Sequence, residues 1–194
     1  MNKEFTGGGD PRRSLELLWG RQEPGRRGPK QRLSTDAVVK AAIALADAEG
    51  LAALSMRRVA EAVGVSPMSL YTYVPSKAEL VDLMLDRILA DTADPDAAMT
   101  GWREKLAFIA YERWALSERH PWLLDLALHR PPPGPNVMRK AEVMLSAMEG
   151  MGLEPEDAGL AARVALVRAA AAPAGREARV HQLRQHHLRS EEHT

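Results

Sequence analysis

The stretch from Leu54 to Lys77, LSMRRVAEAVGVSPMSLYTYVPSK, constrains the fold more than any other, because it reads as two short helices joined by a tight turn. Ser55 is a suitable N-cap for the first helix, since its hydroxyl can accept a hydrogen bond from an unpaired backbone N–H. Gly64 is expected to end that helix, because glycine turns left-handed without a Cβ penalty. Ser66 caps the second helix and Pro67 occupies its first position, where no N–H is needed. The apolar faces of the two helices are formed by Val59, Ala60, Val63, Leu70, Tyr73 and Val74.

The spacing within this stretch is that of a helix-turn-helix. A small residue, Ala60, precedes Gly64 by four positions. Apolar Val65 follows directly, and Leu70 comes five positions after it. In such a unit the second helix lies in the major groove of DNA while the first crosses the backbone. The alternative is an ordinary αα-hairpin without a role in DNA binding.

Two longer helices are expected on either side of this unit. Ser34 opens the first of them and Gly50 ends it. The capping box Ser76–Glu79 starts the second, which runs to about Ala93 and would connect to the rest of the chain. Residues 34–76 are therefore assigned to a three-helix, helix-turn-helix DNA-binding domain.

Composition limits the class of protein. Aromatic residues make up only 5% of the chain while Ala, Leu and Met are plentiful, which favours helices over a sheet. The absence of cysteine excludes a disulfide framework and a thiolate metal site, and suits a reducing cytoplasm. No apolar run is long enough to cross a membrane, so we expect a cytoplasmic protein with no membrane partner.

Charge is unevenly distributed although the net charge is zero. Residues 11–33 carry seven Lys or Arg against two Glu, whereas residues 81–194 carry 14 Lys or Arg against 17 Asp or Glu. We expect residues 1–33 to be a flexible basic arm, in which Arg26, Arg27 and Lys30 follow DNA phosphates or enter the minor groove. The alternative for these cations is a solvated linker. Ser14–Trp19, before them, could form one or two amphipathic turns.

The remainder reads as helices, so the predicted fold class is all-α. Residues 77–172 are assigned to a helical body domain, for which the resemblance given below implies a regulatory role in ligand binding and dimerisation. The expected helices are Trp102–His120, Pro121–His129, Asn136 to about Met151, and Asp157–Ala172.

The apolar pattern fails after Pro173. Residues 173–194 are interpreted as an aberrant tail and not as native sequence, because the final RSEEHT also reads like a translated sequencing adapter. The fold is therefore expected to be truncated at its C-terminus. Three histidines in the tail, at 181, 186 and 187, are read as solvated and not as a metal cluster.

Enzyme motifs are missing from the sequence. There is no HExxH, no phosphate-binding glycine loop, no nucleophile beside a base and no suitably spaced carboxylate pair. We therefore expect no catalytic residues, no metal, no cofactor and no enzymatic activity.

Two segments carry a family resemblance. RLSTDAVVKAAIALADAEGLAALSMRRVAEAVGVSPMSLYTYVPSKAELVDLM, residues 32–84, resembles the DNA-binding head of the Tet repressor (TetR) family of bacterial regulators. HPWLLDLALHRPPPGPNVMRKAEVMLSAMEGMGL, residues 120–153, is similar to the body of members with the tetracycline-repressor-like C-terminal domain. The resemblance implies an all-α homodimer that binds a palindromic double-stranded operator and is usually a repressor released by a small-molecule effector. Dimerisation is expected only if the C-terminal helices are intact.

The resemblance also implies the DNA contacts, and side-chain chemistry supports them. Arg57 can make a bidentate contact to guanine, and Met68 or Thr72 can pack on a thymine methyl. Tyr73 could instead be partly buried, and Lys77 could be a solvated first-turn residue. The predicted contacts are Ser55, Arg57, Pro67, Met68, Ser69, Tyr71, Thr72, Tyr73 and Lys77, in addition to the three cations of the arm.

An apolar pocket for a hydrophobic or amphipathic effector is predicted in the body. Its expected lining is Met84, Trp102, Trp114, Trp122, His129, Met138, Met144 and Met148. For each of these residues a place in the ordinary core is the alternative. The predicted function is a sequence-specific transcriptional regulator, and the alternative is a helical protein-interaction module that no longer binds DNA.

Overall fold

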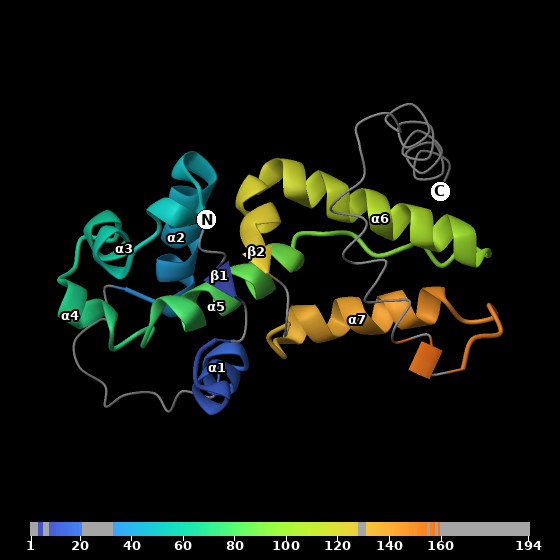
Figure 1. Cartoon of the computed structure of the whole chain (residues 1–194), viewed down its shortest axis with the longest axis horizontal. Helices are drawn as coiled ribbons and strands as arrows, with labels where there is room; N and C mark the ends of the chain where they lie inside the picture. The colour runs from blue at the N-terminus through green and yellow to red at the C-terminus, as the bar shows by residue number, and fades with distance from the viewer. Residues whose placement is uncertain are drawn as a thin grey trace. The chain divides into compact units, whose positions relative to one another are not determined.

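The computed structural model describes residues 8–20, 33–127 and 131–154, the backbone of Glu4–Phe5, and residues 156, 157 and 159 (Figure 1). Their regular secondary structure is almost entirely helical, which confirms the all-α fold class. A two-residue parallel pair of strands, β1 (Glu4–Phe5) with β2 (Leu126–Ala127), is a minor addition. The chain forms two compact units, here called the head unit (residues 1–91 and 117–140) and the body unit (residues 92–116 and 141–194). The predicted four-part division of the chain stays a prediction.

Serine caps define three consecutive helices of the head unit. Ser34, Ser55 and Ser66 each accept a hydrogen bond from a backbone N–H two or three residues on, as predicted. Gly50 and Gly64 have positive φ angles of 81° and 72°. This explains why glycine stands after the helix that Ser34 caps and after the helix that Ser55 caps. The elements are α2 (Thr35–Glu49), the 3-10 helix η1 (Leu51–Ala53), α3 (Met56–Ala62) and α4 (Pro67–Leu70).

Helix α5 (Lys77–Leu89) packs against α2 and ends four residues earlier than Ala93, the predicted end. Ten of its 13 residues are buried, so it is the central helix of the head unit. The core includes side chains from α2, α3, α4 and α5 that are almost fully removed from water. They are Val38, Ala42, Leu51, Leu54, Val59, Ala60, Leu70, Val74, Leu80, Met84 and Ile88.

Helix α1 (Pro11–Leu18) corrects the expectation that residues 1–33 form a flexible arm throughout. Asp10 caps the helix by accepting from the N–H of Arg12, and Pro11 stands at its first position. Ser14, Leu17 and Leu18 are buried because α1 packs along α5. The local periodicity of a helix this short gives little sign of its stability, which comes from that packing.

The connection from α6 (Trp102–Arg119) to α7 (Pro135–Ala147) belongs to the head unit over residues 117–140. The helix predicted for Pro121–His129 is wrong: the chain forms a 3-10 helix, η2 (Pro121–Asp125), followed by β2.

The body unit has a small apolar core between α6 and α7. Ile109 on α6 packs with Met144, Ala147 and Met148, and Leu106 lies against this cluster. Within the described residues, none of the helices has both the length and the apolar character needed to cross a membrane. The helix predicted for Asp157–Ala172, and the tail after it, fall almost wholly outside the described residues.

Candidate nucleic-acid interface

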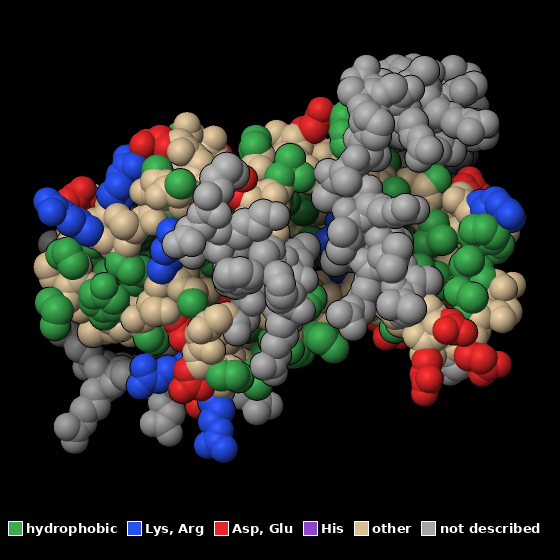
Figure 2. Space-filling model, in the orientation of Figure 1, with side chains coloured by type: hydrophobic (Ala, Val, Ile, Leu, Met, Phe, Trp, Pro, Cys, Tyr) green, Lys and Arg blue, Asp and Glu red, His purple; other side chains and the backbone are tan. Residues whose placement is uncertain are grey.

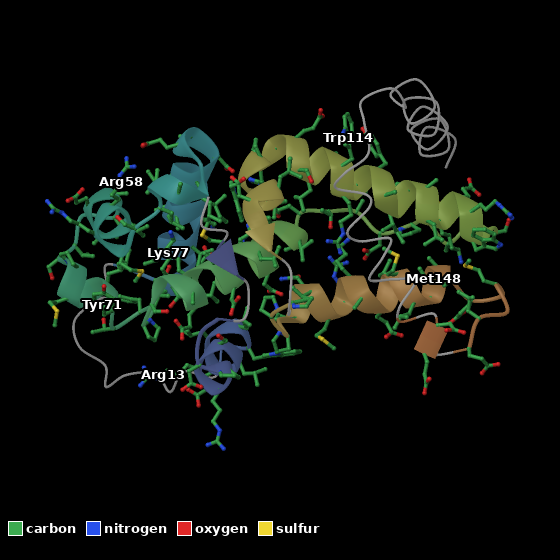
Figure 3. All side chains as sticks on the ribbon, viewed as in Figure 1. Arg13, Arg58, Tyr71, Lys77, Trp114 and Met148 are labelled. Carbon is green, nitrogen blue, oxygen red and sulfur yellow. The ribbon has the colours of Figure 1, made fainter. Side chains whose placement is uncertain are left out.

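Helix α4 presents most of its side chains to solvent. Met68 is 78% exposed although it is apolar, whereas Leu70 in the same turn is completely buried. Pro67 and Ser69 are exposed as well, and Tyr71, directly after the helix, is 45% exposed (Figure 3). The helix is therefore anchored by one side chain and open on the rest of its circumference.

Local hydrogen bonds fix the polar groups of this surface. Ser66 Oγ accepts from the N–H of Ser69 at 3.1 Å and lies 2.9 Å from Ser69 Oγ. Thr72 Oγ1 donates to the carbonyl oxygen of Ser69 at 2.6 Å. Because the Thr72 hydroxyl proton is engaged, a base contact by Thr72 has to use its methyl group or an oxygen lone pair.

Helix α3 adds an exposed guanidinium. The Arg57 side chain is 81% exposed and its Nε donates to Glu61 Oε1 at 2.9 Å, one helical turn away. Ser55 Oγ is engaged as the N-cap, accepting from the N–H of Arg58 at 3.3 Å. An exposed ion pair of this kind is weak, so Arg57 can exchange Glu61 for a phosphate or a guanine at little cost.

Arg58, one position further on, was missed as a structural residue in the sequence. Its Nη1 donates to Glu49 Oε2 at 2.8 Å and its Nη2 to Glu49 Oε1 at 2.5 Å, so the pair is bidentate and joins α3 to α2. The hydrogen bond from Arg58 lowers the pKa of Glu49, and the same bond raises the pKa of Arg58. The pair links α3 to α2. In the sequence Arg58 looks like an ordinary surface charge, so this contact could not be predicted from it.

The remaining predicted contacts differ in exposure. Tyr73 is half-buried, as the alternative expectation had it, and Lys77 is half-buried with its Nζ 3.5 Å from the carbonyl oxygen of Leu51. Arg26, Arg27 and Lys30 lie outside the described residues.

Exposed apolar and cationic side chains share one end of the head unit. Figure 2 shows apolar side chains over α3 and α4 with Lys or Arg side chains beside them. Charge next to an exposed recognition helix is the arrangement that phosphate neutralisation requires. Arg13 on α1 projects into solvent (Figure 3) and adds a further cation that the sequence had not singled out.

The predicted pocket residues are divided between the two units. Met84 and Trp122 are buried in the head unit, where Trp122 is only 1% exposed, and Met138 is exposed there. Met144 and Met148 belong to the body core.

The other two tryptophans predicted for the pocket, Trp102 and Trp114, are half-buried in the body unit. The Arg103 guanidinium lies 3.9 Å from the ring centroid of Trp102, and the ring of Tyr111 lies 6.0 Å from that of Trp114. His129 lies outside the described residues. The structure therefore brings together Met144 and Met148 in one cluster, and the pocket as a whole stays a prediction.

Arg113 is a further polar group on the buried stripe of α6. Leu106, Ile109 and Leu116 share its helix face at spacings of three, four and three residues. Burial lowers the pKa of the Arg113 guanidinium to about 10. The helical spacing could have identified it, because a cation between apolar positions of one face is unusual.

These features define the class of protein: a helical protein with a helix-turn-helix head whose second helix is exposed. Comparison with family models matches residues 38–84 to the bacterial regulatory proteins of the tetR family, and residues 94–186 to the tetracyclin repressor-like C-terminal domain. The chain belongs to the TetR family of bacterial regulatory proteins.

Individual relatives agree with this assignment. The chain is 50% identical over 155 residues to the HTH-type transcriptional repressor DrrR1 of Streptomyces coeruleorubidus, covering 79% of this chain and 57% of DrrR1. It is 35% identical to an HTH-type transcriptional regulator of Saccharopolyspora erythraea, covering 72% of this chain and 59% of that protein. The chain thus spans less than two thirds of the length of these relatives.

Solved structures give the same result. The TetR family protein ActR of Streptomyces coelicolor is 32% identical and superposes with a TM-score of 0.66, over 72% of this chain and 68% of ActR. ActR has been solved without ligand and in complex with (S)-DNPA and with actinorhodin.

Proposed function

We propose that this chain is a sequence-specific DNA-binding transcriptional repressor which a small-molecule effector releases from its operator. The observation that carries the proposal is the exposure of α4. Met68 and Ser69 are exposed to solvent, whereas Leu70 is buried and anchors the helix to the core. Family membership and the similarity to the repressor DrrR1 support it. Repressors of this kind act where the DNA is, in the cytoplasm.

In the proposed complex α4 enters the major groove. Met68 and the Thr72 methyl group pack on thymine methyls, and Ser69 reads a base edge. Arg57 leaves Glu61 for a guanine or a phosphate, and Ser55 approaches the backbone from the start of α3. Tyr71, Tyr73 and Lys77 reach phosphates with their polar ends, and the cations at 26, 27 and 30 follow the adjacent backbone.

The proposed effector is a hydrophobic or amphipathic molecule bound by the helical body. The complexes of ActR with actinorhodin and (S)-DNPA support an effector of this general kind. The apolar cluster of Ile109, Met144 and Met148 supplies a described part of a suitable wall. The protein is proposed to act as a homodimer on a palindromic operator, with two heads reaching successive major grooves.

Selection of bound duplexes from a random pool tests the proposal most directly. We expect an enriched inverted repeat, and an affinity that falls steeply between low and moderate salt as phosphate contacts are screened. A Met68→Ala, Ser69→Ala double variant is the matched control, since both side chains are exposed and the head should stay folded. Absence of any enriched sequence would refute the proposal and favour a helical interaction module.

Size-exclusion chromatography with light scattering gives the mass of the protein in solution and tests the homodimer separately. A dimeric mass would fit the inverted repeat. A monomer that selects only a single half-site would refute the dimer and leave the DNA-binding function intact.

A further inference from the structure

The helix-turn-helix of residues 54–76 carries only three charged side chains. Arg57, Arg58 and Glu61 all lie on α3, and neither α4 nor the turn that precedes it contains a charged residue. Attraction to DNA that does not depend on sequence comes from cations that neutralise phosphates. Within this unit, such attraction by side chains can therefore come only from the two arginines of α3.

Arg58 is committed to the fold. Its two terminal nitrogens donate to both oxygens of Glu49, and its Nη1 also lies 3.4 Å from the carbonyl oxygen of Ala53. A bidentate pair of a guanidinium with a carboxylate is stronger and better oriented than a single contact. Arg58 would have to break the link between α3 and α2 in order to bind a phosphate. Arg57 is therefore the arginine that this unit can offer to DNA.

Arg57 is paired in a different way. One hydrogen bond, from Arg57 Nε to Glu61 Oε1 at 2.9 Å, joins the two side chains across one helical turn. Both side chains are largely exposed, so water competes for the two groups and the pair opens easily. While the pair is closed, its two charges cancel.

Carboxylates that hold the fold of the head unit together are bound more firmly. Asp47 Oδ1 lies 2.7 Å from His120 Nδ1 and accepts from Trp122 Nε1 at 2.7 Å, and the Trp122 ring is buried. These bonds attach the 3-10 helix η2 to the last turn of α2. Two donors and a buried ring make this carboxylate a fixed part of the fold.

Asp86 on α5 is bound in the same way. Its Oδ1 accepts from the backbone N–H groups of Asn136 at 3.0 Å and Val137 at 2.9 Å, and its Oδ2 accepts from Asn136 Nδ2 at 2.9 Å. Asp86 therefore caps α7, and Asn136 lies inside that helix, which corrects the prediction that it is the first residue. A Cβ at Gly134 would overlap Asp86 Oδ1, so glycine leaves room for the cap. Glu61, by contrast, has a single exposed donor on its own helix.

A phosphate and a guanine place different demands on the pair of Arg57 and Glu61. To bind a phosphate, Arg57 has to leave Glu61, and the bare carboxylate then repels the phosphate beside it. The edge of a guanine is uncharged and offers O6 and N7 to two nitrogens of the guanidinium. Exchange of Glu61 for a guanine therefore gains two hydrogen bonds for the one that is lost, whereas exchange for a phosphate replaces one anion by another.

We propose that Glu61 determines specificity: it withholds Arg57 from the phosphates of non-operator DNA and releases it to a guanine of the operator. The proposal rests on the function proposed above, and it adds a residue that the predicted interface does not include. A regulator meets far more non-operator DNA than operator, so weak binding to the former leaves more protein for the latter. Glu61 thus acts by weakening the binding of the wrong DNA.

The salt dependence of binding to a duplex of random sequence measures the withheld charge. The Arg57→Ala, Glu61→Ala variant lacks the whole pair, so its slope of log affinity against log salt should equal that of the wild type. Glu61→Ala frees Arg57 for one phosphate, so the slope should steepen by about 0.9 and the affinity in low salt should rise several-fold. A wild-type slope as steep as that of Glu61→Ala would overturn the proposal, because Arg57 would then already bind a phosphate.

Glu104→Ala is the matched control for net charge. Glu104 is an exposed carboxylate on α6 in the body unit, and its removal changes the net charge by the same amount. The slope on the random duplex should stay at the wild-type value. A steepening equal to that of Glu61→Ala would mean that the slope reports total charge and not the release of Arg57, and it would overturn the proposal.

The ratio of the affinities for the selected operator and for the random duplex gives the functional result. Glu61→Ala should strengthen binding to both duplexes but to the random duplex by more, so this ratio should fall several-fold. In the Arg57→Ala background the same substitution should leave the ratio unchanged, because no cation remains to be released. A ratio that does not fall in Glu61→Ala, or that falls equally in both backgrounds, would overturn the role of Glu61 in specificity.

Failure of the proposed function would give a different result. No sequence would then be enriched in the selection, although the random duplex would still bind and its salt dependence could be measured. Those slopes alone decide whether Glu61 withholds Arg57 from phosphates, since they need no operator.

Discussion

Helices α4 and α5 are consecutive in the chain, but their polar side chains lie in opposite environments: exposed on α4 and buried on α5. Three of the four residues of α4 are exposed, and its hydroxyls are engaged in local bonds around Ser66. Ten of the 13 residues of α5 are buried, and among them are the carboxylates of Glu79, Asp82 and Asp86. The helix that is proposed to read DNA sequence is anchored by one buried side chain, whereas most of the helix after it is buried.

Each buried carboxylate of α5 has a donor from a distant segment. Glu79 accepts from the N–H of Asp10 at 3.0 Å and from the Ser76 hydroxyl, and Asp82 accepts from the Ser14 hydroxyl at 3.2 Å. Burying a carboxylate without donors would be very unfavourable. Polar residues of α4 can therefore change with the operator, whereas those of α5 are fixed by the segments they hold.

The contrast within α4 itself predicts the largest effect. Leu70→Ala removes a fully buried side chain and should lower the free energy of unfolding by about 3 kcal/mol. Met68→Ala, two positions earlier, should change it by less than about 0.5 kcal/mol, because Met68 is exposed. Urea denaturation monitored by circular dichroism measures both. Similar losses in the two variants would mean that Met68 packs against the protein and is not available to DNA.

Substitutions of two glycines test how firmly the buried Asp86 carboxylate of α5 is held in place. Gly134→Ala should destabilise the chain by about 2 kcal/mol, since the new methyl group would overlap the Asp86 carboxylate. Gly101→Ala has nothing within 4 Å of the new Cβ and should be nearly neutral in the same denaturation experiment. A tolerated Gly134→Ala would show that Asp86 does not need its place at the start of α7.

Arg57 tests the exposed surface by affinity. Arg57→Ala should weaken operator binding by about 1–3 kcal/mol and relax preference at one base pair, with little change in stability. Glu61→Ala frees the same guanidinium and removes a negative charge, so it should strengthen binding. Fluorescence anisotropy with the selected duplex measures both variants. Unchanged affinity and base preference in Arg57→Ala would remove that residue from the interface.

The smallest effect concerns the ion pair between Arg58 on α3 and Glu49 on α2. The pKa of Glu49 is lowered by Arg58, so the pair stabilises the fold above the unfolded-state pKa of 4.5 and loses its effect as pH falls through the lower folded value. Glu49→Gln should therefore be slightly less stable than wild type near neutral pH, and the two should converge in acid. A gap in stability that persists unchanged into acid, in parallel denaturation series, would contradict this linkage.

Local signals in the sequence predicted the head correctly. Ser34, Ser55, Ser66 and Ser76 cap the helices they were assigned to, because an N-cap bond spans only two or three residues. Leu70 is buried as its helical spacing requires.

Long-range contacts could not be predicted in the same way. Asp47 and Asp86 resemble ordinary surface carboxylates in the sequence, and their partners lie 50 to 75 residues away. Of α1 only one or two turns at Ser14–Trp19 were expected, because its packing along α5 is likewise a long-range contact. Trp122 was assigned to a ligand pocket because apolar size alone does not show that its N–H meets a carboxylate of the head.

The bonds of Asp47 and Asp86 also limit how regulators of this kind can be recombined. A chimera joined between residues 84 and 94, where the two family models meet, would take Asp47 from one parent and Trp122 from the other. A junction after residue 86 would also separate Asp86 from Gly134, and Asp86 would clash with any side chain that the other parent has at position 134. A functional domain exchange should therefore transplant residues 117–140 together with the DNA-binding helices, even though these residues are distant in the chain.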